Sequence, residues 1–239
     1  MFLNSALTAA LDNIAERAAD VRRAFTPGAL PQHDDVATPS SKSDFTLDPL
    51  AAAAPDGAYF VVRDDRGEYR YTRAGDFEIR DGRLTDRSGA TVCGIRAPGG
   101  EVTTLRLDAV DVALGRVSGA RIEPDGTLSY RRDAIDPRNG GRDSQRIVAG
   151  RVLLAGFPGA TRLESDGDYL RPPAGVEPQR SLPGEGKFGT LEPMHRERSR
   201  INIDQGLARL KEAYIRFEAL AAAENAKGRL GKTAMDLLK

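Results

Sequence analysis

The sequence predicts an α+β protein in which an antiparallel β-rich central domain is flanked by N- and C-terminal helices that pair as a coiled-coil-like layer. Two observations lead to this class. Near both ends of the chain, apolar residues recur in steps of three and four, the spacing of one face of a helix. Between these ends, short alternating segments are separated by turn residues and show no helical period. This pattern argues against a doubly wound α/β enzyme.

The N-terminal helix is expected within residues 1–28. Its apolar stripe ends where Thr26, Pro27 and Gly28 supply a helix breaker and a flexible residue. The stripe is suited to packing against a second helix. Its members that we expect at an assembly interface are Leu3, Leu7, Leu11, Ile14 and Val21.

The C-terminal helix is expected within residues 189–239, after a connector. Its stripe then reaches Glu224, Gly228 and Gly231, and a glycine costs up to about 1 kcal/mol in a helix interior. We therefore expect its first part to pack most firmly. The alternative is that both terminal helices cover one face of the sheet in a monomer. The expected interface residues of this helix are Ile203, Leu207, Leu210, Tyr214 and Phe217.

Residues 29–54 are expected to form a linker, because they are rich in Pro, Ser, Asp and Ala and lack an apolar period. Residues 55–188 are expected to form the β-rich domain. Turns rich in Gly and Asp separate its short segments, as in an antiparallel sheet. The strand candidates are residues 58–62, 68–73, 76–79, 91–95, 103–107, 120–122, 127–130 and 146–155.

Composition narrows the classes of function. Lys and Arg total 35, as do Asp and Glu, so net charge does not point to nucleic acid. No apolar run approaches the roughly 18 residues of a membrane-spanning helix. The N-terminus has no basic leader followed by a continuous apolar run, so we expect no cleaved signal peptide.

Candidates for catalysis or metal binding are few. Cys93 is the only cysteine and lies among apolar residues, so we expect a buried thiol rather than a nucleophile. His33 and His195 are the only histidines and lie in the expected linker and connector. We therefore predict no enzymatic activity, no cofactor, no metal and no small-molecule substrate.

Two stretches of the β-rich region carry an ordered set of motifs. The first reads Tyr71-Thr72-Arg73-x-Gly75-x-Phe77, followed by Gly82, and the second begins with Asp125-Gly126 and continues to Phe157 and Gly167. These motifs resemble those of the flagellar basal-body rod and hook protein family. The N-terminal helix diverges from the family, because Ala19-Asp20-Val21-Arg22-Arg23 stands where an Asn-Asn-x-Ala-Asn run is usual.

The resemblance implies a structural subunit of the bacterial flagellar basal-body rod. Such subunits assemble through their terminal helices into a hollow axial tube that transmits torque. The implied partners are copies of this chain, other flagellar axial proteins and the flagellar type III export apparatus. The implied location is the periplasm-spanning basal body. The alternatives are a flagellar hook subunit, or a monomeric β-domain adaptor that binds a flagellar partner.

The motif residues are expected to be architectural rather than a binding surface. Gly75 suits a bulge or a turn with positive φ, and Phe77 suits the core of a sheet.

Overall fold

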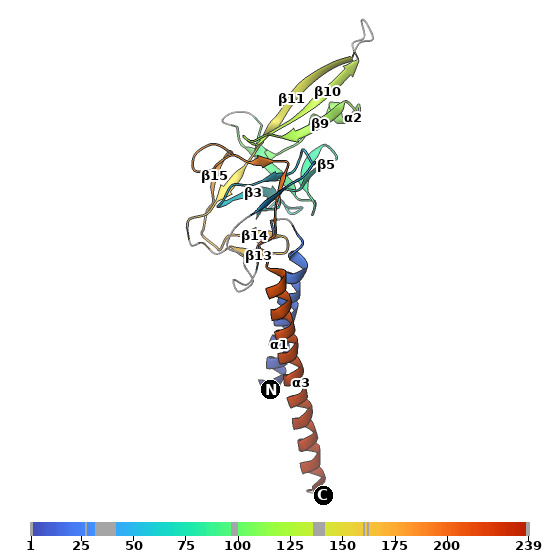
Figure 1. The fold of residues 1–239 in the computed structure, drawn as a ribbon, viewed down its shortest axis with the longest axis vertical. Coiled ribbons are helices and arrows are strands. Elements are labelled where there is room, and N and C mark those ends of the chain that lie inside the picture. The colour runs from blue at the N-terminus through green and yellow to red at the C-terminus, as the bar shows by residue number, and fades with distance from the viewer. Residues whose placement is uncertain are drawn as a thin grey trace. The chain divides into compact units, whose positions relative to one another are not determined.

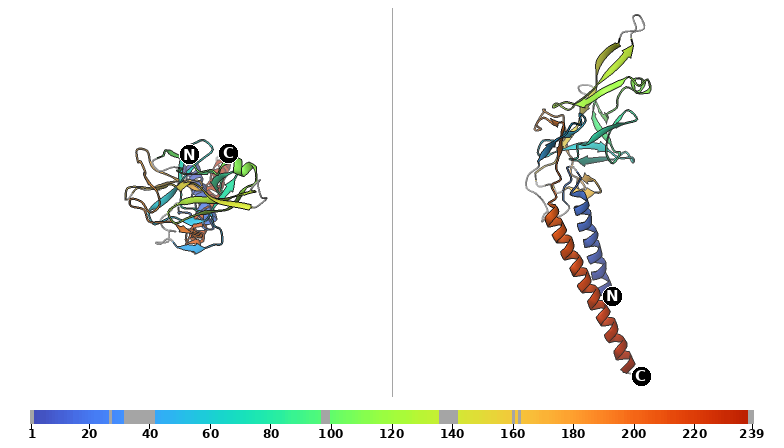
Figure 2. Two further views of the ribbon diagram at one scale, coloured as in Figure 1. Left: turned by 90° about the horizontal axis from the view of Figure 1, so that it is seen from above. Right: turned by 45° about the vertical axis from the view of Figure 1, so that its right-hand side comes forward.

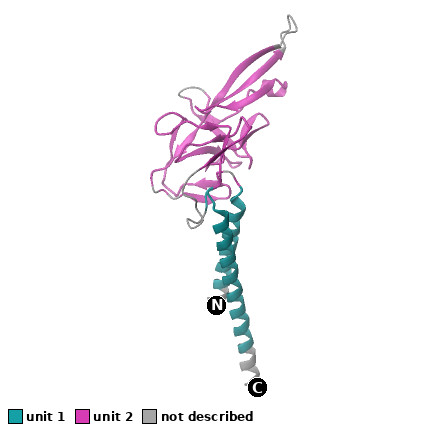
Figure 3. Cartoon of the chain, in the orientation of Figure 1, with its two compact units in different colours: residues 1–25, 30–39, 200–239 teal, residues 26–29, 40–199 magenta. Residues whose placement is uncertain are grey.

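The chain divides into two compact units (Figure 3). Unit 1 comprises residues 1–25, 30–39 and 200–239, and unit 2 comprises residues 26–29 and 40–199. This computed structural model describes residues 2–26, 28–31, 42–96, 100–135, 142–159, 161 and 163–237. No helix in this described part is long and apolar enough to cross a membrane.

Unit 1 is built on helices α1 (Phe2–Arg23) and α3 (Ile203–Leu237), which pack side by side and run in opposite directions (Figures 1 and 2). The side chain of Asn202 accepts hydrogen bonds from the backbone N–H groups of Asp204, at 3.1 Å, and Gln205, at 3.2 Å. Asparagine at this position satisfies N–H groups that the first turn of a helix leaves unpaired. Asn202 therefore fixes where α3 begins.

Unit 2 is dominated by one antiparallel sheet (Figure 1). Its longest path has the order β13-β14-β4-β3-β7-β11-β10-β9. Those strands are β3 (Ala58–Arg63), β4 (Tyr69–Thr72), β7 (Thr91–Ile95), β9 (Val117–Ile122), β10 (Thr127–Ile135), β11 (Arg142–Val152), β13 (Glu164–Asp166) and β14 (Tyr169–Arg171). Branching from this path are β5 (Phe77–Arg80), β6 (Arg83–Asp86), β8 (Val102–Thr104), β12 (Leu154–Gly156) and β15 (Gln179–Ser181). The α+β class and the antiparallel β-rich body are thus confirmed.

The expected linker contains two strands of unit 2. Strand β1 (Ser43–Phe45) pairs with β17 (His195–Glu197), and β2 (Ala52–Ala53) pairs with β16 (Glu192–Pro193). The prediction that all of residues 29–54 form a linker is therefore wrong for its second half. Both segments are too short to show an alternating pattern, and their partners lie far along the chain. Residues 32–41 of the expected linker, His33 among them, lie outside the described part.

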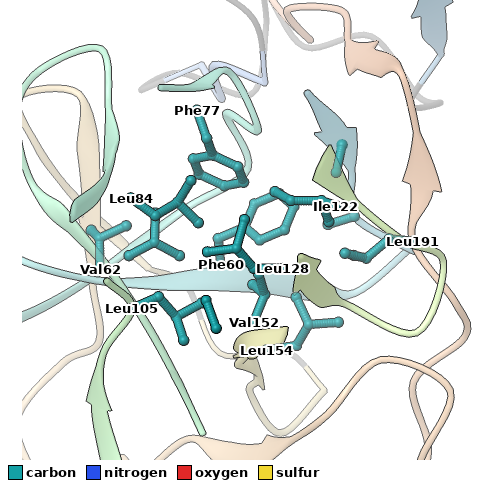
Figure 4. Close-up of a cluster of buried hydrophobic side chains, with 14 of the residues drawn as sticks. Phe60, Val62, Phe77, Leu84, Leu105, Ile122, Leu128, Val152, Leu154 and Leu191 are labelled. Carbon is teal, nitrogen blue, oxygen red and sulfur yellow. The ribbon is translucent and has the colours of Figure 1, made fainter. Parts of the chain in front are cut away.

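The core of unit 2 is a single apolar cluster inside the sheet (Figure 4). The rings of Phe60 and Phe77 meet edge to face with centroids 4.9 Å apart, and both side chains are at most 2% exposed. The expectation that Phe77 lies in the sheet core is therefore confirmed. Other labelled members are Val62, Leu84, Leu105, Ile122, Leu128, Val152, Leu154 and Leu191.

A short helix, α2 (Ala109–Ala113), was not expected from the sequence. Its Asp111 is buried and accepts hydrogen bonds from Tyr130 Oη, at 2.7 Å, and Arg132 Nε, at 2.8 Å. The hydrogen bonds from Arg132 and Tyr130 lower the pKa of the Asp111 carboxyl. They attach α2 to the middle of β10.

Gly75 is required because two backbone segments approach each other closely. Its φ is not positive, so the expected left-handed turn is wrong. Its carbonyl oxygen instead accepts a hydrogen bond from Ala52 N–H at 3.0 Å. A Cβ atom at position 75 would lie 1.7 Å from the carbonyl oxygen of Ala52. Any side chain at position 75 would therefore push β2 away from the segment that contains Gly75.

We predict that Gly75→Ala lowers the free energy of unfolding of unit 2 by about 2 kcal/mol or more, the range of overpacked sites, because backbone atoms must move. Urea unfolding of the full chain, followed by circular dichroism, measures the loss. Gly159→Ala is the matched control, since Gly159 also lacks a positive φ and a Cβ there would meet no atom within 4 Å. Equal stabilities of the two variants would contradict the prediction.

Candidate assembly interface

Part of each predicted helical stripe is shielded where α1 and α3 pack together. Leu7, Ile14 and Val21 of α1 are half-buried, as are Ile203, Leu210 and Phe217 of α3. The helices approach closely at Gly206, which is buried and where a Cβ atom would lie 3.3 Å from Val21 Cγ2. Small residues at such points allow two helices to approach closely.

The other members of the stripes are open to solvent. Leu11 is 51% exposed, Leu207 is 49% exposed and Tyr214 is 53% exposed. The side chain of Leu3 lies outside the described part. At 3.6 residues per turn, Leu207 and Tyr214 lie within about 20° of each other on the helix surface. They form one strip beside the half-buried face of α3.

A groove runs along the α1–α3 pair. It encloses about 660 Å³ and is lined by alanines and by charged side chains, most of which come from α3. Arg209 Nη1 and Glu212 Oε2 are 2.9 Å apart in an exposed pair. The groove residues are Ala6, Ala9, Ala10, Asn13 and Arg17 of α1, and Arg209, Glu212, Ala213, Arg216 and Leu220 of α3.

Helix α3 extends past the first residue of α1 (Figure 2). It continues as one helix through Gly228 and Gly231 to Leu237. Leu230, in this extension, is 72% exposed, and a Cβ at Gly228 would meet no atom within 4 Å. Helix α3 is therefore open to solvent at Leu230 and Gly228.

The motif residue Arg73 forms a deeply buried ion pair with Glu197. Its Nε donates to Glu197 Oε2 at 2.6 Å, and both side chains are 2% exposed. Its other nitrogens donate to the carbonyl oxygens of Ala54, at 3.1 Å, and Ala58, at 2.7 Å. The carbonyl of Glu197 accepts a hydrogen bond from Gly28 N–H at 2.8 Å.

The close packing around Arg73 also requires a glycine at position 28. Its φ is +67°, and a Cβ atom there would lie 2.5 Å from the backbone carbon of Arg73. The glycine of the Thr26-Pro27-Gly28 segment therefore allows the chain to pass against the motif. Sequence analysis missed Glu197, which is 124 positions from Arg73. No local pattern connects residues at that separation.

The remaining motif residues form turns and core contacts. Tyr71 and Phe157 meet edge to face with centroids 5.0 Å apart. Thr72 Oγ1 accepts a hydrogen bond from Ala74 N–H, and the Asp125 carboxylate accepts one from Thr127 N–H, both at 3.0 Å. Positive φ angles explain the three glycines Gly82, Gly126 and Gly167. The motif is thus spread over unit 2 and does not gather into one pocket.

Cys93 is 1% exposed, and burial raises the pKa of its thiol to about 11. A thiol with such a pKa is almost entirely protonated at neutral pH, and the protonated form is a poor nucleophile. These properties fit a packing role for Cys93.

We predict that Arg73→Met lowers the free energy of unfolding of unit 2 by about 3–5 kcal/mol, because it leaves the Glu197 carboxylate buried without its guanidinium. Urea unfolding of the full chain provides the measurement. Arg198→Met is the control: Arg198 pairs with Asp44 at 2.6 Å, but both side chains are more than half exposed, so water replaces the lost partner. A loss at Arg198 as large as that at Arg73 would contradict the prediction.

Comparison with known proteins gives one informative relative. No family model matches the chain. The chain is 25% identical over 209 residues to the flagellar basal-body rod protein FlgG of Caulobacter vibrioides, which covers 86% of this chain and 70% of the relative. The matched residues outnumber those of unit 2, so the similarity extends into unit 1. The chain is therefore similar, at low identity, to a flagellar basal-body rod protein over most of its length.

Proposed function

We propose that this chain is a structural, non-enzymatic subunit of the bacterial flagellar basal-body rod. The observation that carries the proposal is the similarity to a rod protein over 86% of the chain. Subunits would join copies of themselves and other axial proteins in a hollow tube that transmits torque. They would reach the basal body through the flagellar type III export apparatus, without a cleaved signal peptide.

The solvent-open strip on unit 1 supports this proposal. Leu207 and Tyr214 are about half exposed although their neighbours Leu210 and Phe217 are partly shielded by packing. Exposed apolar area next to a helix pair is stabilised when another helix covers it, because burial removes it from water. We assign this strip, with Leu11 of α1, to contacts between subunits. The half-buried stripe residues would hold α1 and α3 together as a coiled-coil-like pair.

The Arg73–Glu197 pair supports the same function in another way. A subunit that transmits torque must resist deformation where the chain enters and leaves unit 2. Gly28 and Glu197 lie at those two places and are joined by a hydrogen bond of 2.8 Å. We infer that this hydrogen bond holds the two segments together within unit 2.

Deletion of the coding sequence tests the function directly. Electron microscopy of purified basal bodies should reveal a missing or shortened rod, and the cells should not swim. The wild-type chain supplied from a plasmid should restore both. An intact rod and hook in cells without the chain would contradict the proposal.

Substitution of the open strip tests the assigned surface. We expect the variant Leu207→Lys with Tyr214→Lys to keep its helical circular dichroism and melting temperature, since both side chains are about half exposed. It should fail to restore swimming and be absent from basal bodies. Leu47→Lys is the control, because Leu47 is 83% exposed in unit 2. A swimming strain with the double variant in its rods would disprove the assignment, whereas a one-to-one complex with another flagellar protein would favour an adaptor.

A further inference from the structure

Two clusters of charged side chains near opposite ends of the main sheet in unit 2 carry opposite excess charge. The strand order runs from β13 to β9, and Figure 1 places these strands at opposite ends of the unit. At the β9 end, three guanidinium groups lie together, and two of them share one carboxylate. At the β13 end, three carboxylates share one guanidinium group.

The β9 end holds a pocket of about 390 Å³ that we call the arginine pocket. Its charged lining is Arg121, Arg131 and Arg146, and Pro49, Ala120 and Tyr130 contribute to its walls. Glu123 Oε1 lies 2.5 Å from Arg146 Nη2 and 3.3 Å from Arg121 Nε. Within the described residues, no carboxylate pairs with Arg131. These three arginines and Glu123 together therefore carry two positive charges in excess.

The register of the sheet makes this excess of positive charge destabilising. Arg131 of β10 and Arg146 of β11 are directly opposite each other, and like charges at such positions destabilise a sheet. Gly119, at φ +56°, allows the Arg131 guanidinium to lie over β9, because a Cβ there would be 3.3 Å from Arg131 Nε. An anionic group that entered the pocket would relieve the repulsion between the two arginines.

The β13 end, which we call the acidic end, has the complementary arrangement. Arg70 Nη2 lies 2.7 Å from Glu68 Oε2 and 3.2 Å from Asp64 Oδ2. Its Nε lies 3.3 Å from Asp166 Oδ2. The Arg70 side chain is 10% exposed, whereas those of Glu68 and Asp166 are 59% and 53% exposed. Two negative charges are thus in excess, and the carboxylates that carry them face water.

We propose that the arginine pocket of one copy receives the Glu68 and Asp166 carboxylates of a second copy. The equal and opposite excess charges argue for this occupant. The two surfaces differ, so the contact is head to tail and does not close on itself as a twofold dimer does. The inference rests on the proposed function only in requiring that copies adjoin, and it adds a contact through unit 2 to the one through the helices.

Two charge reversals on the full chain test the contact. Arg131→Glu neutralises the arginine pocket. Glu68→Lys neutralises the acidic end and leaves Arg70 paired with Asp64 and Asp166. Lys187→Glu is the matched control, because Lys187 is exposed and lines neither surface. Sedimentation velocity over a protein concentration series, at about 0.02 M and about 0.5 M salt, gives the self-association constant, since salt screens a charged contact much more than an apolar one.

We expect the wild type and Lys187→Glu to associate at least about tenfold more weakly at the higher salt. At low salt, each reversal should weaken association about tenfold or more. An equimolar mixture of the two reversal variants retains one intact pocket and one intact acidic end. It should therefore regain association through this contact between unlike partners only, in pairs that the contact itself cannot extend, a result that only a head-to-tail contact predicts.

Several results would overturn the inference. One is no association of the wild type at low salt, and another is equal association of Arg131→Glu and Lys187→Glu. A loss with Arg131→Glu but not with Glu68→Lys would mean that another anion occupies the pocket. These results are separate from the deletion experiment, where an intact rod without the chain would contradict the proposed function itself.

Discussion

A buried guanidinium group is stable only where carboxylate and carbonyl oxygens replace the water it has lost, and unit 2 is arranged to satisfy this requirement at Arg73. Glu197 supplies the charge, and the backbone around Ala54 and Ala58 supplies the remaining acceptors. These oxygens come from β17, from the segment that follows β2 and from the start of β3. One side chain therefore fixes the relative positions of segments that short strands alone would hold weakly.

Unit 1 follows a different principle. Its helices shield only part of their apolar residues from water, and Leu11, Leu207 and Tyr214 stay about half exposed. In a monomeric helix pair, apolar side chains at such positions add no stability because they stay in water. In a subunit with neighbours, each of them can be buried and so stabilise the assembly. The two sets of residues can therefore have different roles. The half-buried face can hold α1 and α3 together, and the open strip can contact partners. This arrangement agrees with a structural role that depends on neighbours.

Sequence patterns predicted the features that are local. Alternation and turn residues identified most strands of the main sheet, and Phe77 was correctly placed in its core. The patterns did not reveal α2, whose five residues are too few for a helical period, or β1 and β2, which are short and pair with distant strands. At the candidate interface, the stripes were found, but the division into shielded and open residues depends on how α1 and α3 meet. The Glu197 partner of Arg73 depends on the tertiary fold in the same way.

The burial of Cys93 makes this thiol a natural reporter of the state of unit 2. While the sheet is intact, the side chain is closed to solvent. When the sheet opens, the chain exposes a thiol at a single, known position near the middle of its sequence. Thiol labelling at chosen times could therefore distinguish unfolded copies of the chain from folded ones, without any engineered label.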